Sequence, residues 1–241
     1  MEYIHNTEQF QFHNTVVALG KFDGMHKGHQ LIFDELIKYK EMGYQAAVFS
    51  FDRPPLNMLK HKHMNVIYTT NEKTKLLAKR GIDIYIEHPF TDEFSHLSPE
   101  DFVIKVLLEK TGMKVLVVGD DCGFGYKRQG NVELLERMSK EYDFKLIVIP
   151  KLELEGEIVS STRVRRLLSE GRIEEANRLM EDPFMICGPV VHGNHMGAEV
   201  LQMPTANQIP LEDKLLPPNG VYVSRIHYKD ETYYGISNVG V

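Results

Sequence analysis

The chain has 241 residues, 42% of them hydrophobic and 26% charged, a composition typical of a globular protein with a sizeable core. Its formal net charge of -6 argues against a general nucleic-acid-binding protein, which would carry a basic surface. Its two separated cysteines, Cys122 and Cys187, form no disulfide framework, and no apolar run suits a signal peptide or a membrane span. We therefore expect a cytoplasmic protein without membrane or nucleic-acid partners, and the sequence carries no signal for an oligomeric state.

The first three quarters of the chain alternate short apolar segments with amphipathic ones. The segments expected to be strands are 15–20, 44–51, 82–87, 114–119 and 145–150. The segments expected to be helices are 28–42, 71–80 (capped by Asn71 and ended by Gly81), one opened by Ser98, 132–142, 162–169 and 173–180. This alternation predicts an α/β fold, a Rossmann-like and mostly parallel sheet with helices on both faces.

The pattern changes near residue 182. Beyond it we expect short strands at 185–192, 220–228 and 231–237, with a turn at Lys229 and Asp230, and no amphipathic helix. We therefore predict two domains, an α/β nucleotide-binding domain over 1–182 and a smaller, partial β-rich domain over 183–241.

The strongest motif directly follows the first predicted strand and reads GKFDGMHKGH over residues 20–29. His26 and His29 are three residues apart at a helix start, where free N–H groups and the helix dipole favour a phosphate. Gly28 lets a ligand approach the backbone closely. Two imidazoles there can donate hydrogen bonds to a phosphate in a transition state. Taken alone, HxGH is more often a pair of surface histidines; a zinc site is disfavoured because no third ligand is evident.

The second motif reads VSSTRVRR over residues 159–166. Three hydroxyl side chains at a helix start can cap the helix and also bond phosphate oxygens, and an arginine can hold a departing pyrophosphate. Taken alone, this motif is better explained as an ordinary N-cap with a basic helix face. Since both motifs lie beyond the carboxyl ends of predicted parallel strands, we expect them to share one cleft.

Three stretches together carry a resemblance to a known family: 20–29, GDDCGFGYKRQGN at 119–131, and VSSTRVRRLL at 159–168. They resemble the adenylyltransferase domain of bacterial bifunctional riboflavin kinase/FMN adenylyltransferases (FAD synthetases), in the HxGH nucleotidylyltransferase superfamily. The tail, with PTAN at 204–207 and PPNGVYVSRI at 217–226, resembles the start of that family's riboflavin kinase domain. The resemblance implies ATP and FMN as substrates, FAD and pyrophosphate as products, and Mg²⁺ bound with ATP; it assigns no protein metal ligand.

The resemblance also implies residue roles. Catalysis would use His26, His29 and Arg165. ATP would be contacted by Gly20, Phe22, Asp23, Gly28, Ser160, Ser161, Thr162 and Arg163. The flavin would be contacted by Phe51, Asp52, Asp121, Phe124 and Arg128, although Phe124 could equally be a core residue.

The sequence also departs from the family pattern. Arg53 and Pro54 replace a histidine between prolines, Cys122 replaces an aromatic residue, and residues 198–202 lack the glycines of a Gly-Arg-x-x-Gly run. From the last departure and the end of the chain at Val241 we expect no riboflavin kinase activity. Three alternatives stay open: a fragment of a bifunctional enzyme, a related nucleotidylyltransferase with another nucleotide or phosphate substrate, and a non-catalytic flavin-binding protein.

Overall fold

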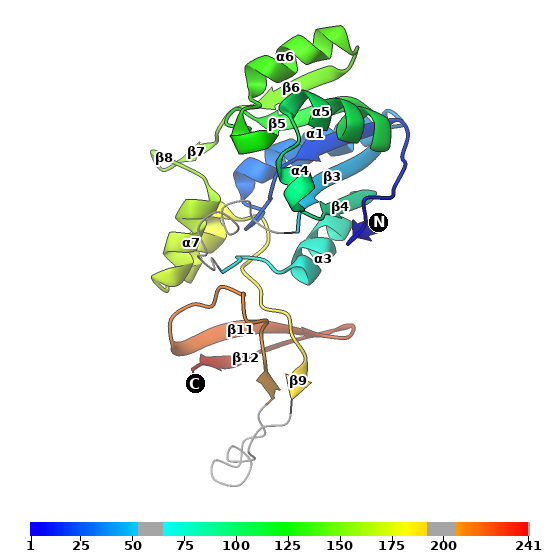
Figure 1. Ribbon diagram of the computed structural model, residues 1–241. Coiled ribbons are helices and arrows are strands. Elements are labelled where there is room, and N and C mark those ends of the chain that lie inside the picture. The colour runs from blue at the N-terminus through cyan, green and yellow to red at the C-terminus, as the bar shows by residue number, and fades with distance from the viewer. Residues whose placement is uncertain (53–64, 192–205, 241) are drawn as a thin grey trace, which may run out of the picture.

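A six-stranded parallel sheet forms the centre of the computed structural model, which describes residues 1–52, 65–191 and 206–240 (Figure 1). Its strands are β1 (Glu2–His5), β2 (Thr15–Leu19), β3 (Gln45–Phe51), β4 (Ile84–His88), β5 (Met113–Gly119) and β6 (Lys145–Ile149). Their order is β1-β4-β3-β2-β5-β6, and every neighbouring pair is parallel. The predicted fold class is confirmed, whereas the edge strand β1 was missed.

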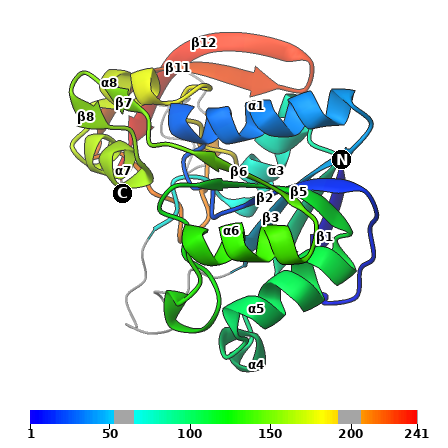
Figure 2. The same cartoon turned by 90° about the horizontal axis from the view of Figure 1, so that it is seen from above.

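Helices cover both faces of this sheet (Figure 2). They are α1 (Lys27–Glu41), α3 (Thr70–Arg80), α4 (Asp92–Ser95), α5 (Pro99–Asp101), the π-helix η1 (Phe102–Lys110), the 3₁₀ turn η2 (Tyr126–Arg128), α6 (Val132–Glu141), α7 (Ser161–Ser169) and α8 (Ile173–Leu179). Successive strand residues point to opposite faces, so Val16 belongs to the core cluster that includes residues of α1, α3, α7 and α8, while Val17 belongs to the cluster that includes residues of η1 and α6. The near-continuous apolar strands are buried because both faces are covered.

The helix ends depend on local capping. Thr69, and not the predicted Asn71, caps α3: its hydroxyl accepts from the Glu72 amide and the Glu72 carboxylate accepts from the Thr69 amide. Gly81, at φ 89°, ends that helix in the left-handed region, as predicted. Ser98 caps α5 by accepting from the amide of Asp101.

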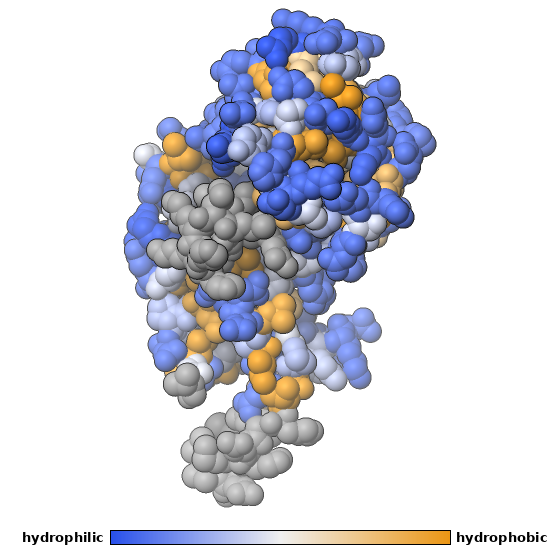
Figure 3. Space-filling model, in the orientation of Figure 1, coloured by the Kyte–Doolittle hydropathy of each residue, from blue (hydrophilic) through white to orange (hydrophobic). Residues whose placement is uncertain are grey.

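The chain after α8 is rich in β-structure. It contains β9 (Val190–Val191), β10 (Asn207–Gln208) and a long hairpin of β11 (Gly220–Tyr228) and β12 (Glu231–Val239). The predicted turn at Lys229 and Asp230 is present, whereas residues 185–189 form no strand. In the orientation of Figure 1, apolar side chains are visible around this lower part of the molecule (Figure 3), and the hairpin exposes residues such as Val223. No helix among the described residues is both long and apolar enough to cross a membrane.

Candidate active site

The loop between β2 and α1 has a strained backbone. Phe22 and Met25 adopt positive φ angles of 49° and 38°, which side-chain-bearing residues rarely do. The Phe22 ring, 3% exposed, packs against His29 and Phe33 with centroids 5.2 and 5.0 Å away. It also fills the space beside Gly20, where an added Cβ would lie 2.9 Å from it. Phe22 therefore supports the loop from inside the core, and its contact with ATP stays a prediction.

The two histidines stack at the start of α1. Their ring centroids lie 3.7 Å apart with 20° between the planes, and His26 is the N-cap residue. Burial lowers the pKa of His26 to about 4, and burial together with His26 lowers the pKa of His29 well below 6.5. Both rings are therefore neutral at pH 7, and each has one N–H to donate. The Nδ1 atom of each is buried without a hydrogen-bond partner among the described residues, a strain typical of functional sites.

The start of α7 lies directly against this loop. The Ser161 hydroxyl donates to the carbonyl of Asp23 at 2.6 Å, and Arg165 Nη2 donates to Asp23 Oδ2 at 2.6 Å. An added Cβ on Gly28 would lie 3.7 Å from the carbonyl oxygen of Val159. The two motifs, 138 residues apart at Asp23 and Ser161, thus form one site with two helix N-termini beside each other.

The other α7 residues differ in position. Ser160 caps the helix by accepting from the amide of Arg163 at 3.2 Å, and Thr162 is exposed. Arg163 points away from the site: Nη1 donates to the carbonyls of Leu154 and Glu157 in the hairpin of β7 (Glu153–Leu154) and β8 (Glu157–Ile158). This buried guanidinium therefore joins that hairpin to α7, and the contact of Arg163 with ATP stays a prediction.

The predicted flavin residues are spread along the carboxyl edge of β3 and β5. Phe124 is buried and packs against Phe102 at 5.8 Å, so it is a core residue and not an exposed stacking surface. Asp121 pairs with Lys151 at 3.2 Å on the surface. Arg128 lies over Gly123, where an added Cβ would come within 2.8 Å of its guanidinium.

Phe51 is the last residue of β3, and Asp52 follows it at the same edge. The Phe51 ring meets Phe90 and Phe94 with centroids 5.4 and 5.7 Å away, an aromatic surface that is partly exposed. Asp52 Oδ1 accepts from the amide of Phe90 at 2.9 Å, which fixes the turn after β4. Arg53 and Pro54 lie outside the described residues, as do residues 198–202 and the first two residues of the PTAN run, Pro204 and Thr205.

Lys21 is a cation at this site that the sequence analysis did not single out. Loss of solvent and the charge of Arg128 lower its pKa, with Arg165 adding to the effect and Asp23 opposing it, although the residue as a whole is exposed. Three cations and one carboxylate therefore share this region, an arrangement suited to a polyanion. The signal was available in the sequence, since Lys21 directly follows Gly20 after the first strand.

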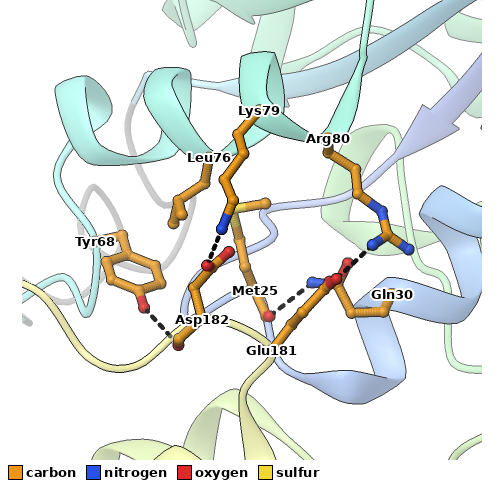
Figure 4. Close-up of a pocket in the computed structure, with 8 residues that line it drawn as sticks. All are labelled: Met25, Gln30, Tyr68, Leu76, Lys79, Arg80, Glu181 and Asp182. Atoms are coloured by element: carbon orange, nitrogen blue, oxygen red, sulfur yellow. Dashed lines mark hydrogen bonds and ion pairs between the residues drawn. The ribbon is translucent and has the colours of Figure 1, made fainter. Parts of the chain in front are cut away.

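A small cavity of about 90 Å³ lies behind the histidine loop (Figure 4). Gln30 of α1 donates from its side-chain amide to the carbonyl of Met25, and ion pairs of Lys79 with Asp182 and Arg80 with Glu181 close the other side. These pairs fasten the chain after α8 to the end of α3. The cavity is too small for a nucleotide.

Comparisons with known proteins extend this picture. The family described as FAD synthetase matches residues 8–163, and the family described as riboflavin kinase matches residues 180–241. The chain is 38% identical to a "Bifunctional riboflavin kinase/FMN adenylyltransferase" of Buchnera aphidicola, covering 99% of this chain and 77% of that protein. Proteins of the same description in Listeria monocytogenes and Escherichia coli K12 are 34% and 32% identical, with 99% and 98% of this chain and 77% and 76% of theirs covered.

A solved structure is also similar over nearly the whole chain. It is described as a macrolide-efflux protein from Streptococcus pneumoniae, is 30% identical, and superposes with a TM-score of 0.86, covering 99% of this chain and 78% of that one. The prediction that riboflavin kinase activity is absent finds no support in these comparisons, since a riboflavin kinase family matches the tail and the relatives are described as bifunctional. The residues on which that prediction relied are outside the described part of the chain.

Proposed function

Because the chain belongs to the FAD synthetase family of bifunctional riboflavin kinase/FMN adenylyltransferases, we propose that it transfers AMP from ATP to FMN, forming FAD and pyrophosphate. The observation that carries this proposal is the contact of the two helix starts through Asp23, Ser161 and Arg165 beside His26 and His29. We also propose that the domain for this reaction ends near residue 182, where the alternation of strands and helices stops.

ATP is placed with its phosphates between the starts of α1 and α7. Amide N–H groups and the helix dipoles favour the negative charge, and the absence of a side chain on Gly28 lets the His26 ring lie close against the first of these helix starts. Arg165 and the exposed hydroxyl of Thr162, near the start of α7, can bind the β- and γ-phosphates, whereas the O–H of Ser161 already donates to the Asp23 carbonyl. Lys21 adds charge beside them.

Chemistry at this site needs no enzyme nucleophile. The phosphate of FMN attacks the α-phosphorus of ATP in line, the bond to the β-phosphate oxygen breaks, and pyrophosphate leaves. His26 and His29, neutral and fixed by stacking, each donate an N–H to phosphate oxygens as their charge redistributes. Positioning and electrostatic stabilisation then supply the rate acceleration.

Mg²⁺ fits this site as an ion carried by ATP. No group of three His, Cys, Asp or Glu side chains in the described ranges could hold a metal, and both oxygens of Asp23 already accept hydrogen bonds from protein groups. Mg²⁺ commonly takes phosphate oxygens and water as ligands and neutralises phosphate charge. FMN is placed on the side of Phe51 and Asp52, where partly exposed aromatic rings can contact the isoalloxazine.

The test is label transfer from α-³²P-ATP to FMN. We expect label in FAD with one pyrophosphate released per FAD. Replacing either histidine by alanine should lower kcat about 10²- to 10³-fold, the usual effect of losing one preorganised transition-state donor. Tight flavin binding without label transfer would instead identify a non-catalytic flavin-binding protein, and full turnover by His26→Ala would refute the assigned chemistry.

A further inference from the structure

Lys214 is a buried cation that enters the α/β domain from the C-terminal part of the chain. Its side chain is 1% exposed, and Nζ donates to Glu72 Oε2 at 2.7 Å, to the Ile67 carbonyl at 2.6 Å and to the Met185 carbonyl at 2.7 Å. All three N–H groups of the ammonium are therefore used. The cation also lies 4.5 Å from the centroid of the Phe184 ring.

A buried ion pair of this kind is poorly explained by stability alone. The Glu72 side chain is 0% exposed, and removing two charges from water costs about as much as their attraction returns. Two apolar side chains of similar volume would serve as well for packing. Unlike an apolar side chain, Lys214 fixes the position of one backbone carbonyl, that of Ile67, by a directional hydrogen bond.

That carbonyl belongs to a short segment, residues 65–69, which is held from two sides. On the C-terminal side, the amide of Val66 donates to the Asp213 carbonyl at 2.7 Å, and the amide of Leu215 donates to the Val66 carbonyl at 2.8 Å. On the active-site side, the amides of Ile67 and Tyr68 donate to Asp23 Oδ1 at 3.0 and 3.2 Å.

The same segment contacts Arg165. The Asn65 carbonyl accepts from Nη1 of this arginine, whose Nη2 donates to Asp23 Oδ2. A continuous series of contacts thus runs from Lys214 through residues 65–69 to Asp23 and Arg165. A shift of the segment would move both partners that orient the Arg165 guanidinium.

We propose that Lys214 is a positioning residue for ATP, which holds residues 65–69 so that Asp23 and Arg165 keep the geometry needed to bind the triphosphate. This inference rests on the proposed function only in taking ATP as the substrate of this site. It makes the C-terminal region a structural part of the adenylyl-transfer site.

The test compares Lys214→Met/Glu72→Gln with the wild type in the full chain. The double variant removes both buried charges and the bond to the Ile67 carbonyl, while the glutamine oxygen introduced at position 72 can still accept from the Thr69 amide that caps α3. The bond that the other Glu72 oxygen accepts from the Cys187 amide is lost, so a thermal melt of each variant first establishes that it is folded. We expect the Kd of a non-hydrolysable ATP analogue, measured by calorimetry, and the KM for ATP to rise about fivefold, the effect of one hydrogen bond of ordinary net strength. The KM for FMN should change less than about twofold, a factor that corresponds to the spread of about 0.5 kcal/mol among net hydrogen-bond free energies.

Lys79→Met is the matched control. Lys79 also joins α3 to the C-terminal part of the chain, through Asp182, but at the far end of the helix and on the surface (Figure 4). It should leave the ATP-analogue Kd unchanged. A double variant that binds the analogue as the wild type does would overturn the inference, as would an equal loss in Lys79→Met. Wild-type protein that binds no ATP analogue would instead overturn the proposed function.

Discussion

Asp23 joins three parts of the site through one carboxylate, so its pair with Arg165 should show a measurable energetic coupling. The Nη2–Oδ2 distance is 2.6 Å, and the two side chains are 20% and 19% exposed. Breaking a fully buried pair costs about 3–5 kcal/mol, whereas exposed pairs contribute about 0–1 kcal/mol. For this mostly buried pair we expect Asp23→Asn and Arg165→Met each to lower the free energy of unfolding by about 2 kcal/mol, between those limits.

Urea denaturation of the wild type, both single variants and the double variant gives the coupling energy directly. We expect a coupling of about 1–2 kcal/mol, since the Asp23→Asn side chain keeps the hydrogen bonds to residues 67 and 68 but places an amide N–H group against the guanidinium. The control is Arg166→Met, which breaks a largely exposed pair with Glu157 and should cost under about 1 kcal/mol. Strictly additive losses from the two single variants would refute the assigned ion pair.

Three further predictions concern single residues. Because the pKa of His26 is lowered to about 4, the unfolded chain binds more protons than the folded chain between about pH 4 and 6.5, and stability falls as the pH is lowered through that window. His26→Asn introduces a side chain that suits the N-cap position of α1 and should remove about 2 kcal/mol of the stability loss between pH 7 and 5, measured by urea denaturation; an unchanged pH dependence would contradict this. Gly28→Ala places a Cβ 3.2 Å from His26 Nδ1 and should displace the ring, so kcat/KM for ATP should fall about tenfold while the free energy of unfolding is maintained. Unaltered kinetics would show that the position of the His26 ring is not critical. Gly112 has a φ of 62°, and an added Cβ would lie 2.4 Å from the Phe12 carbonyl oxygen, so Gly112→Ala should lower the free energy of unfolding by more than about 2 kcal/mol. The KM for ATP of the folded protein should stay unchanged, and a variant as stable as the wild type would contradict that contact.

The central sheet could be predicted because its signals are local. Apolar strands and amphipathic helices alternate with regular spacing, and Gly81 stops α3 as its position indicates. The edge strand β1 was not predicted because its four residues mix polar and apolar types and gain strand structure only by pairing with β4. The cap of α3 was misplaced because both Thr69 and Asn71 are suitable capping residues, and the reciprocal bond with Glu72 decides between them.

The sequence predicted where the site lies better than it predicted the contacts that individual side chains make there. The helix starts at His26 and Ser161 meet because both lie beyond the carboxyl ends of parallel strands, β2 and β6, although the β7–β8 hairpin separates α7 from β6. The sequence could not show on which side of α7 Arg163 lies, and its spacing from the hydroxyl residues suited a phosphate ligand as well as a structural role. Lys214 contacts Glu72 across 142 residues, a pairing that no local pattern indicates.

A crystal structure with a non-hydrolysable ATP analogue and FMN tests most directly whether two distant helix starts bind one triphosphate. We expect the phosphates between the first turns of α1 and α7, with His26 and His29 donating to them and Arg165 within hydrogen-bond distance of the β- or γ-phosphate. A nucleotide bound elsewhere on the chain, with both helix starts unoccupied, would contradict the account.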